Sequence, residues 1–241
     1  MSAGIWNLWH GCKKYSEGCA HCYVYRRDES VGRDASEVFR TSTFAAPVAR
    51  RRSGEYKIPP GSHVFACMTS DFFLEEADGW RDEAWEFIRE RSDVNFTIIT
   101  KRALRVADCL PRGMDRAPDN VRLLVTMENQ RRVDERLPVL LSLPFAKKGI
   151  ICEPLLDAVD FRGMLTPEIG SVTVGGESGP DARELRYEWV LSIRDQCAAA
   201  GVAFGFKQTG ANFVRDGRRY AIERRFQHSQ AKKANVDLPG R

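Results

Sequence analysis

The chain has 241 residues, of which 43% are hydrophobic and 29% are charged, and its formal net charge is +4. This length allows one large domain or two small ones, with ample apolar content for a core. Because no apolar run approaches the roughly 20 residues that span a bilayer, and the first residues lack the basic start and apolar stretch of a signal peptide, we predict a soluble, cytoplasmic protein with no membrane partner.

Short apolar runs rich in Val, Ile, Phe and Leu recur along the chain. They show little alternation of polar and apolar residues, which is typical of strands buried on both faces. A first strand is expected in "GIWNLW", at residues 4–9. The later runs lie at 63–68, 95–100, 121–127, 148–153, 171–176 and 202–207.

Amphipathic segments separate these runs and predict helices. The segment 79–91 spaces Trp80, Ala84, Phe87 and Ile88 along one face. Two further segments, 129–143 and 187–201, show the same pattern, and Gly201 is a C-cap candidate for the second. Strands that alternate with helices predict an α/β protein with a parallel sheet, either open or closed as a barrel, of six to seven strands. A complete (β/α)8 barrel needs one or two more strands.

Positive charge is concentrated near the C-terminus. Residues 210–241 contain eight Lys or Arg and three Asp or Glu, which leaves the other 209 residues at −1. A second basic run, "ARRRSGEYK", begins at Ala49. Such runs either form a solvated surface or neutralise the phosphates of a nucleic acid. We predict a barrel-like domain over residues 1–209 and a basic C-terminal extension over residues 210–241.

Polar side chains follow each predicted strand. In parallel α/β folds ligands bind at the carboxyl ends of strands, so we expect these groups to face one binding site. Each of them alone could be a helix cap or a turn residue. The groups are Ser70 and Asp71, then Thr100, Lys101 and Arg102, then Glu128, Asn129 and Gln130, then Glu153, then Gly175, Gly176, Glu177 and Ser178, and finally Lys207 and Gln208.

Three cysteines lie close together after the first strand, in "GCKKYSEGCAHCY" at residues 11–23. Structural zinc would take Cys12, Cys19 and Cys22 with His10 or His21 as the fourth ligand. An iron–sulfur cluster held by the three thiolates alone would keep one iron open for a small molecule. Because the triplet follows a strand of the predicted sheet, where ligands bind, we favour the cluster. The other four cysteines are scattered in apolar contexts, as reduced thiols in a cytoplasm would be.

A three-cysteine loop after the first strand of a partial (β/α) barrel resembles the radical S-adenosylmethionine superfamily. The blocks "WNLWHGCKKYSEGCAHCY", "TKR", "VTMENQ", "CEPL", "GGESG" and "WVLSIRDQCAAAGVAFGFKQTG" are similar, in order, to a bacterial and phage-encoded three-Cys-motif family of unknown function. The likeness runs from about residue 6 to residue 210. The loop departs from the usual Cys-x3-Cys-x2-Cys spacing of the superfamily, because the first gap here has six residues.

The resemblance implies a partial barrel and a specific chemistry. Cys12, Cys19 and Cys22 would bind a [4Fe–4S] cluster whose open iron chelates S-adenosylmethionine, and a flavodoxin- or ferredoxin-type protein would supply the electron. Reductive cleavage would then give a 5′-deoxyadenosyl radical. The positions implied for S-adenosylmethionine are Glu128 and Asn129 at the ribose, Ser70 and Asp71 at the methionine ammonium, and Gly175, Gly176 and Glu177. Lys101, Arg102, Glu153, Lys207 and Gln208 remain for the substrate.

Two features bear on the substrate class. The basic stretches, and the phage association of the similar proteins, favour a nucleotide or a nucleic acid. A small metabolite or a peptide is the rival substrate for a radical enzyme. A protein that binds nucleic acid through a zinc- or cluster-containing module, without catalysis, is the alternative from another class.

Overall fold

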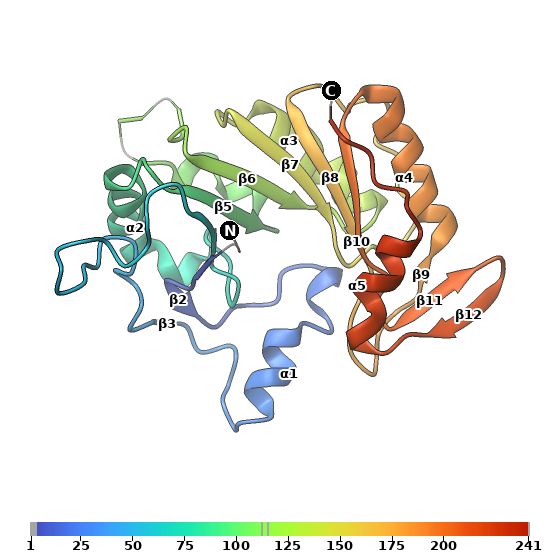
Figure 1. Ribbon diagram of the computed structural model, residues 1–241, viewed down its shortest axis with the longest axis horizontal. Helices are drawn as coiled ribbons and strands as arrows, with labels where there is room; N and C mark the ends of the chain where they lie inside the picture. The colour runs from blue at the N-terminus through green and yellow to red at the C-terminus, as the bar shows by residue number, and fades with distance from the viewer. Residues whose placement is uncertain (1–3, 112, 115, 241) are drawn as a thin grey trace. The chain divides into compact units, whose positions relative to one another are not determined.

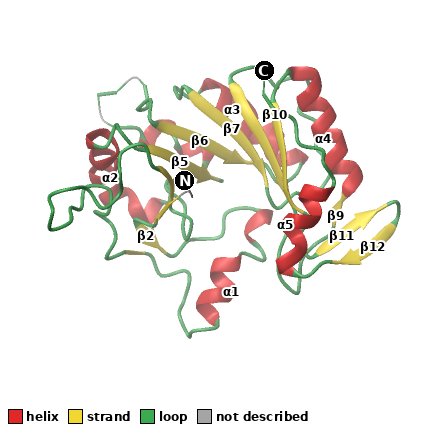
Figure 2. Cartoon of the chain, viewed as in Figure 1, coloured by secondary structure: helices red, strands yellow, loops and turns green. Residues whose placement is uncertain are grey.

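The computed structural model describes residues 4–111, 113–114 and 116–240. It shows an α/β protein whose main sheet has seven strands, in the order β1-β4-β5-β6-β7-β8-β10, with helices flanking it (Figure 2). The pairs whose registers are defined, β1 with β4, β4 with β5, β7 with β8 and β8 with β10, are all parallel. Because β1 and β10 are different edge strands, the sheet is open, as in a partial (β/α) barrel, and the predicted fold class is confirmed.

The described chain forms two compact units, which are treated separately below. The first unit comprises Met1–Tyr15, Val24–Leu124 and Ser142–Lys147. The second comprises Ser16–Tyr23, Val125–Leu141 and Lys148–Arg241. The three cysteines of the loop are therefore divided, with Cys12 in the first unit and Cys19 and Cys22 in the second.

The first unit contains one edge of the main sheet and its covering helix. Its elements are β1 (Gly4–Trp6), β2 (Trp9–His10), most of α1 (Tyr23–Glu29), β3 (Phe39–Arg40), β4 (His63–Ala66), η2 (Glu75–Ala77), α2 (Asp78–Glu90), β5 (Asn95–Thr100), η3 (Ala103–Arg105), η4 (Ala107–Cys109) and the first part of β6 (Val121–Thr126). Long connections join the short strands at its N-terminal end (Figure 1).

Aromatic side chains fill the core of the first unit. Trp85 of α2 is fully buried and packs against Phe72, with ring centroids 5.0 Å apart. Helix α2 buries Arg81, Ala84, Trp85 and Ile88, at the i, i+3, i+4, i+7 spacing of an amphipathic helix. The sequence placed Trp80 and Phe87 on this face, but the structure buries Arg81 and Trp85 more deeply.

The second unit contains the other part of the sheet with its helices. Its elements are η1 (Glu17–Cys19), the end of β6, α3 (Gln130–Ser142) to Leu141, β7 (Lys147–Cys152) from Lys148, β8 (Ile169–Gly175), β9 (Leu185–Arg186), α4 (Tyr187–Ala200), β10 (Ala203–Gln208), β11 (Asn212–Arg215), β12 (Arg218–Ala221) and α5 (Arg224–Lys233). Gly201 ends α4 with φ of +70°, which confirms the predicted C-cap. Strands β12, β11 and β9 form a small separate sheet.

The C-terminal extension is folded rather than a bare tail. The helix α5 lies beside β10, and the hairpin of β11 and β12 lies beside β9 within the second unit (Figure 1). Gln227 of α5 is buried, and its backbone carbonyl accepts a hydrogen bond from the Thr209 N–H. The proposed domain boundary at residue 209 stays a prediction. None of the helices in the described part of the chain is long and apolar enough to cross a membrane.

Candidate functional site

The seven cysteines fall into two classes by exposure. All seven are reduced thiols, and the three loop cysteines are partly exposed. Burial raises the pKa of each of the other four thiols above its usual value, for Cys197 to about 12. A protonated, buried thiol is a poor nucleophile and a poor metal ligand. The buried four are Cys67, Cys109, Cys152 and Cys197, so the loop cysteines are the ones suited to chemistry.

Backbone contacts fix the first segment of the cysteine loop (residues 11–15), which lies in the first unit. Gly11 has φ of +87°, and a Cβ there would lie 1.9 Å from the Glu37 carbonyl oxygen, so only glycine fits. The Cys12 N–H donates to the Ala35 carbonyl at 2.8 Å. The Tyr25 hydroxyl donates to the Cys12 carbonyl at 2.5 Å. The Cys12 backbone is therefore held on both sides while its sulfur stays partly exposed.

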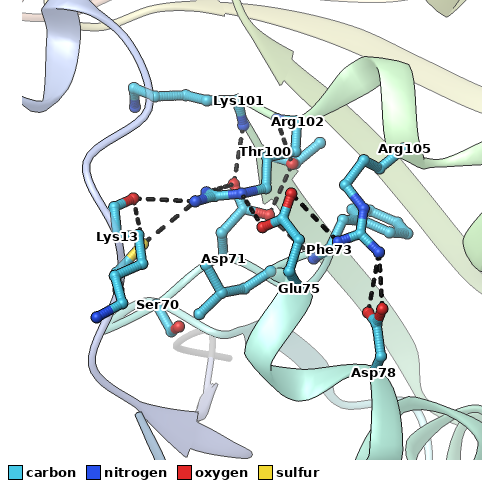
Figure 3. Close-up of polar contacts among 12 residues, drawn as sticks. Lys13, Ser70, Asp71, Phe73, Glu75, Asp78, Thr100, Lys101, Arg102 and Arg105 are labelled. Carbon is cyan, nitrogen blue, oxygen red and sulfur yellow. Dashed lines mark hydrogen bonds and ion pairs between the residues drawn. The ribbon is translucent and has the colours of Figure 1, made fainter. Parts of the chain in front are cut away.

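Asp71, after β4, is the centre of a polar cluster in this unit (Figure 3). Its buried carboxylate accepts hydrogen bonds from the Thr100 hydroxyl at 2.8 Å and from the N–H groups of Lys101 and Phe73 at 3.0 Å each. Arg102 Nη1 lies 3.5 Å from its Oδ2. Asp71 thereby joins the ends of β4 and β5 and positions Arg102.

Arg102 connects this cluster to the cysteine loop. Its Nη2 donates to the Lys13 carbonyl at 2.9 Å, and its Nη1 lies 4.0 Å from the Cys12 sulfur. Burial works against its charge, but Asp71, Cys12 and Glu75 outweigh burial and raise the pKa of Arg102 above its usual value. A permanent positive charge beside the Cys12 sulfur stabilises a thiolate there.

The other two predicted residues of this cluster differ in their contacts. The Ser70 hydroxyl donates to the Gly11 carbonyl, so Ser70 also positions the loop. Lys101 contributes its backbone N–H to Asp71, while its side chain extends away from the carboxylate (Figure 3). Of these two side chains, the Lys101 ammonium is therefore the one left for a ligand.

Glu128 holds the second segment of the loop (residues 16–23), which lies in the second unit. Its side chain is 0% exposed, and it accepts hydrogen bonds from the Ser16 hydroxyl and, at 3.1 Å, from the Gly18 N–H. Arg136 Nη1 pairs with its other oxygen at 2.9 Å. Because Gly18 directly precedes Cys19, this buried carboxylate sets the backbone conformation at that cysteine.

A second ion pair acts on the same turn. Arg132 donates to both carboxylate oxygens of Glu17, from Nε at 2.8 Å and from Nη2 at 3.1 Å. These hydrogen bonds lower the pKa of Glu17 to about 2. Arg183 Nη2 donates to the Glu17 carbonyl at 3.0 Å, so the turn that carries Cys19 is fixed through both its side chain and its backbone.

Glu177, after β8, reaches the residue between the two cysteines of this segment. Its carboxylate lies 3.1 Å from His21 Nδ1 and accepts from Arg183 Nη2 at 2.7 Å. Burial would raise the pKa of Glu177, but the hydrogen bonds from Arg183 and His21 outweigh it, and the pKa lies below its usual value. Glu177 therefore stays ionised and holds the stretch between Cys19 and Cys22.

A third group of predicted residues lies at the ends of β7 and β10. Glu153 pairs with the Lys207 ammonium at 2.7 Å and accepts from the Gln208 amide at 2.5 Å. A Cβ at Gly175 would lie 3.0 Å from the Glu153 side chain. The Lys207 side chain is about half exposed, at 47%, so this end of the sheet presents a charged and reachable pair.

Two remaining predicted positions have local structural roles. A Cβ at Gly176 would lie 2.4 Å from the Thr209 carbonyl oxygen, so this glycine permits a close approach of two backbones. The Asn129 side chain accepts from the Arg132 N–H at 3.0 Å and caps the first turn of α3. The cofactor contacts implied for these residues stay predictions.

The structure thus shows a role that the sequence did not reveal. Several residues expected to touch a cofactor contact the cysteine loop, among them Ser70, Glu128 and Glu177. The arginine partners of Glu17, Glu128 and Glu177 were not among the residues predicted from the sequence. The arginines missed are Arg132, Arg136 and Arg183.

Metal binding is supported by the kind of donor and not by a preformed geometry. Three partly exposed thiols on one loop suit iron or zinc in type and number. In the described part of the chain, however, no three His, Cys, Asp or Glu side chains are gathered in a way that could hold a metal ion. A metal centre would have to draw the thiols together.

Comparison with known families identifies this chain and corrects one prediction. The model of the family described as a protein of unknown function (DUF5131) matches residues 2–241, so the chain belongs to that family. No curated protein and no solved structure matches it. The assignment to the radical S-adenosylmethionine superfamily was wrong, because this family model is the one that matches and no cysteine group in the described residues is arranged for a cluster.

Proposed function

We propose that this member of the DUF5131 family is an iron–sulfur enzyme of the cytoplasm. Cys12, Cys19 and Cys22 would hold a [4Fe–4S] cluster with one open iron, and S-adenosylmethionine would be the small molecule that binds there. The proposal depends on the chemistry of the loop and its supports, and not on membership of the superfamily that the sequence resembles.

The observation that carries it is the way the loop is built. Three buried charged groups contact the loop around the cysteines and a fourth, Asp71, pairs with one of them, while the three thiols stay partly exposed. Burying charge is costly unless each group is paired and hydrogen-bonded. A chain that only needed a surface loop would gain nothing from this arrangement. The charged groups are Asp71, Arg102, Glu128 and Glu177.

The protein's own residues would supply position and charge. A bound cluster contributes the electron for reductive cleavage of S-adenosylmethionine, which a flavodoxin- or ferredoxin-type donor would replace. Arg102 would compensate the negative charge at Cys12. Glu128 and Glu177 would fix the backbone at Cys19 and Cys22. Lys207, paired with Glu153, would attract a phosphate or carboxylate of the substrate, which we take to be a nucleotide or a nucleic acid.

The second candidate function has no catalysis. Zinc accepts three thiolates with one histidine, and His21 lies between Cys19 and Cys22. His21 already contacts Glu177 at 3.1 Å, a contact that would also orient a zinc-bound imidazole. In this case the loop would be the structural element of a nucleic-acid-binding protein.

Anaerobic reconstitution of the full chain with iron and sulfide separates the two functions. We expect about four irons and four labile sulfides per chain, and an electron paramagnetic resonance signal of the reduced protein that changes when S-adenosylmethionine is added. Replacing any one of Cys12, Cys19 and Cys22 with alanine should abolish the cluster. Cys109→Ala is the matched control, because it removes a thiol outside the loop, and it should keep the cluster.

Other outcomes decide against the proposal in different ways. One zinc and no iron under the same conditions would favour the non-catalytic function. A cluster that survives one of the three loop substitutions would overturn the ligand assignment. A cluster whose signal is unchanged by S-adenosylmethionine would support the metal centre but exclude S-adenosylmethionine as its ligand.

A further inference from the structure

The C-terminal part of the second unit presents a basic surface that contains aromatic side chains. Residues 212–233 include seven Lys or Arg and two Asp or Glu. All four residues of β12 are exposed, and so are most side chains of α5. We call β12 and the exposed side of α5 the basic–aromatic surface. Its cations are Arg218, Arg219, Arg224, Arg225, Lys232 and Lys233.

This surface is held in place by the fold. Gln227 and Ala231, one helical turn apart, are the buried residues of α5. The Gln227 side chain donates to the Ile222 carbonyl at 3.0 Å, and His228 Nδ1 lies 2.9 Å from the Lys207 carbonyl oxygen. The buried residues of α5 thus fix the helix, and its exposed cations are displayed on a defined backbone instead of a mobile tail.

Two large aromatic rings are exposed among these cations. Tyr220 is 40% exposed and Phe226 is 43% exposed. The Arg218 guanidinium lies 5.5 Å from the Tyr220 ring, and the Arg225 guanidinium lies 4.6 Å from the Phe226 ring. An exposed phenylalanine on a charged helix does not gain the free energy that removing its ring from water would provide. Stacking against a base would bury part of this ring and so explain its position.

Much of the positive charge remains available for a partner. Arg219 and Arg225 have acidic neighbours, Glu184 at 3.4 Å and Glu223 at 3.0 Å. Within the described part of the chain, Arg218 and Arg224 have no ion pair with an acidic side chain. Solvent-exposed ion pairs are weak, so phosphate groups can compete for the paired arginines as well.

We propose that the basic–aromatic surface binds single-stranded nucleic acid. Phosphates would contact the cations, and unstacked bases would stack on Tyr220 and Phe226, which is the combination that single-strand-binding proteins use. Duplex DNA fits less well, because its bases are already stacked and would leave both rings unused. This inference does not depend on the metal centre, and it can hold even if the loop binds zinc or no metal.

The test uses fluorescence anisotropy of the full chain with labelled oligo-dT and oligo-U of about 20 nucleotides, at two salt concentrations. Arg218→Glu with Arg224→Glu should weaken binding at low salt by tenfold or more, and the salt slope should fall by about 1.4 for two lost phosphate contacts. The matched control, Arg33→Glu with Arg89→Glu, makes the same charge change at two exposed positions of the first unit outside both basic runs and should bind as the wild type does.

Substitutions of the two aromatic residues test the contribution of base stacking separately. Tyr220→Ala and Phe226→Ala should each weaken binding about fivefold or more, while Tyr220→Phe and Phe226→Tyr should keep the affinity. Circular dichroism identifies any variant that fails to fold, and the ring-preserving pair still reports on stacking. Equal binding of a duplex with no effect of the alanine variants would overturn the single-strand assignment. If the charge variant binds with wild-type affinity, or if the control loses as much affinity, the basic–aromatic surface is not the binding site.

Discussion

The two segments of the cysteine loop are held by ion pairs that present opposite charges to it. In the first unit, Arg102 is paired with Asp71, and its guanidinium contacts the Lys13 carbonyl and the Cys12 sulfur. In the second unit, Glu128 is paired with Arg136, and its carboxylate contacts the Gly18 N–H and the Ser16 hydroxyl.

The groups that the loop offers explain this difference. Carbonyl oxygens accept hydrogen bonds and so favour the donor groups of a cation, while N–H and O–H groups can donate to an anion. Asp71 offsets the cost of burying the charge of Arg102, and Arg136 does the same for Glu128. The Arg102–Asp71 pair therefore places a positive charge near the Cys12 sulfur, and the Glu128–Arg136 pair fixes the backbone conformation before Cys19.

The largest effect is expected from removal of the carboxylate in the second unit. Glu128→Ala leaves the guanidinium of Arg136, which is 1% exposed, without its carboxylate, and we expect a loss of about 3–5 kcal/mol in the free energy of unfolding. Urea denaturation followed by circular dichroism measures this loss.

Glu86→Ala is the control for this variant, because it breaks an exposed i, i+3 pair with Arg89. It should cost less than about 1 kcal/mol. If Glu128→Ala is as mild as Glu86→Ala, the carboxylate does not hold the loop, and the comparison between the two pairs fails.

A smaller effect, of a different kind, is expected in the first unit. Arg102→Met leaves Asp71 with three neutral donors, so we expect a loss of about 1.5–3 kcal/mol in stability. Loss of the positive charge should also slow alkylation of Cys12 by about threefold or more. Mass spectrometry of iodoacetamide-treated protein measures this rate, with Cys19 and Cys22 as internal references.

Arg105→Met is the matched control, because Arg105 contacts Glu75 and Asp78 of the same unit but does not contact the loop. The rate at Cys12 should not change in this variant. An unchanged rate in Arg102→Met as well would show that the guanidinium positions the backbone alone, as Glu128 does.

The sequence predicted the strands of the main sheet better than it predicted the smaller elements. Each expected apolar run corresponds to one of β1, β4, β5, β6, β7, β8 and β10, because strands buried on both faces leave a continuous apolar signal. Strands β2, β3 and β9 have two residues each, too few for any periodicity. Strand β12, "RRYA", is exposed at every position and carries no apolar signal.

The candidate site was predictable in position but not in its internal contacts. The predicted residues lie at or just after the carboxyl ends of strands, since the end of a strand can be read from where an apolar run stops. Their role in binding a ligand stays a prediction. The contact that Glu128 makes depends on Ser16 and Gly18, more than a hundred residues earlier. No local pattern encodes which buried acid meets which loop N–H, so this contact could not be predicted from the sequence.

The smallest effect is expected from the exposed ion pair of the second segment, and it depends on pH. Glu17 has a folded-state pKa of about 2, against 4.5 for an unperturbed carboxyl, because Arg132 donates to it. The stabilisation is therefore fully present above about pH 4.5 and is lost as the pH falls towards 2. Since the Glu17 side chain is 39% exposed, solvent screening limits the contribution of the pair to less than about 1 kcal/mol.

Glu17→Gln should accordingly be less stable than the wild type at neutral pH, and the difference between the two should shrink as the pH is lowered below about 4.5. Urea denaturation at several pH values measures it, with Glu76→Gln as a control at an exposed acid of the first unit. A difference that stays constant down to low pH would mean that Glu17 acts through its neutral hydrogen bonds. In that case the ionic support of the second segment would come from the Glu128–Arg136 and Glu177–Arg183 pairs, without a contribution from Glu17.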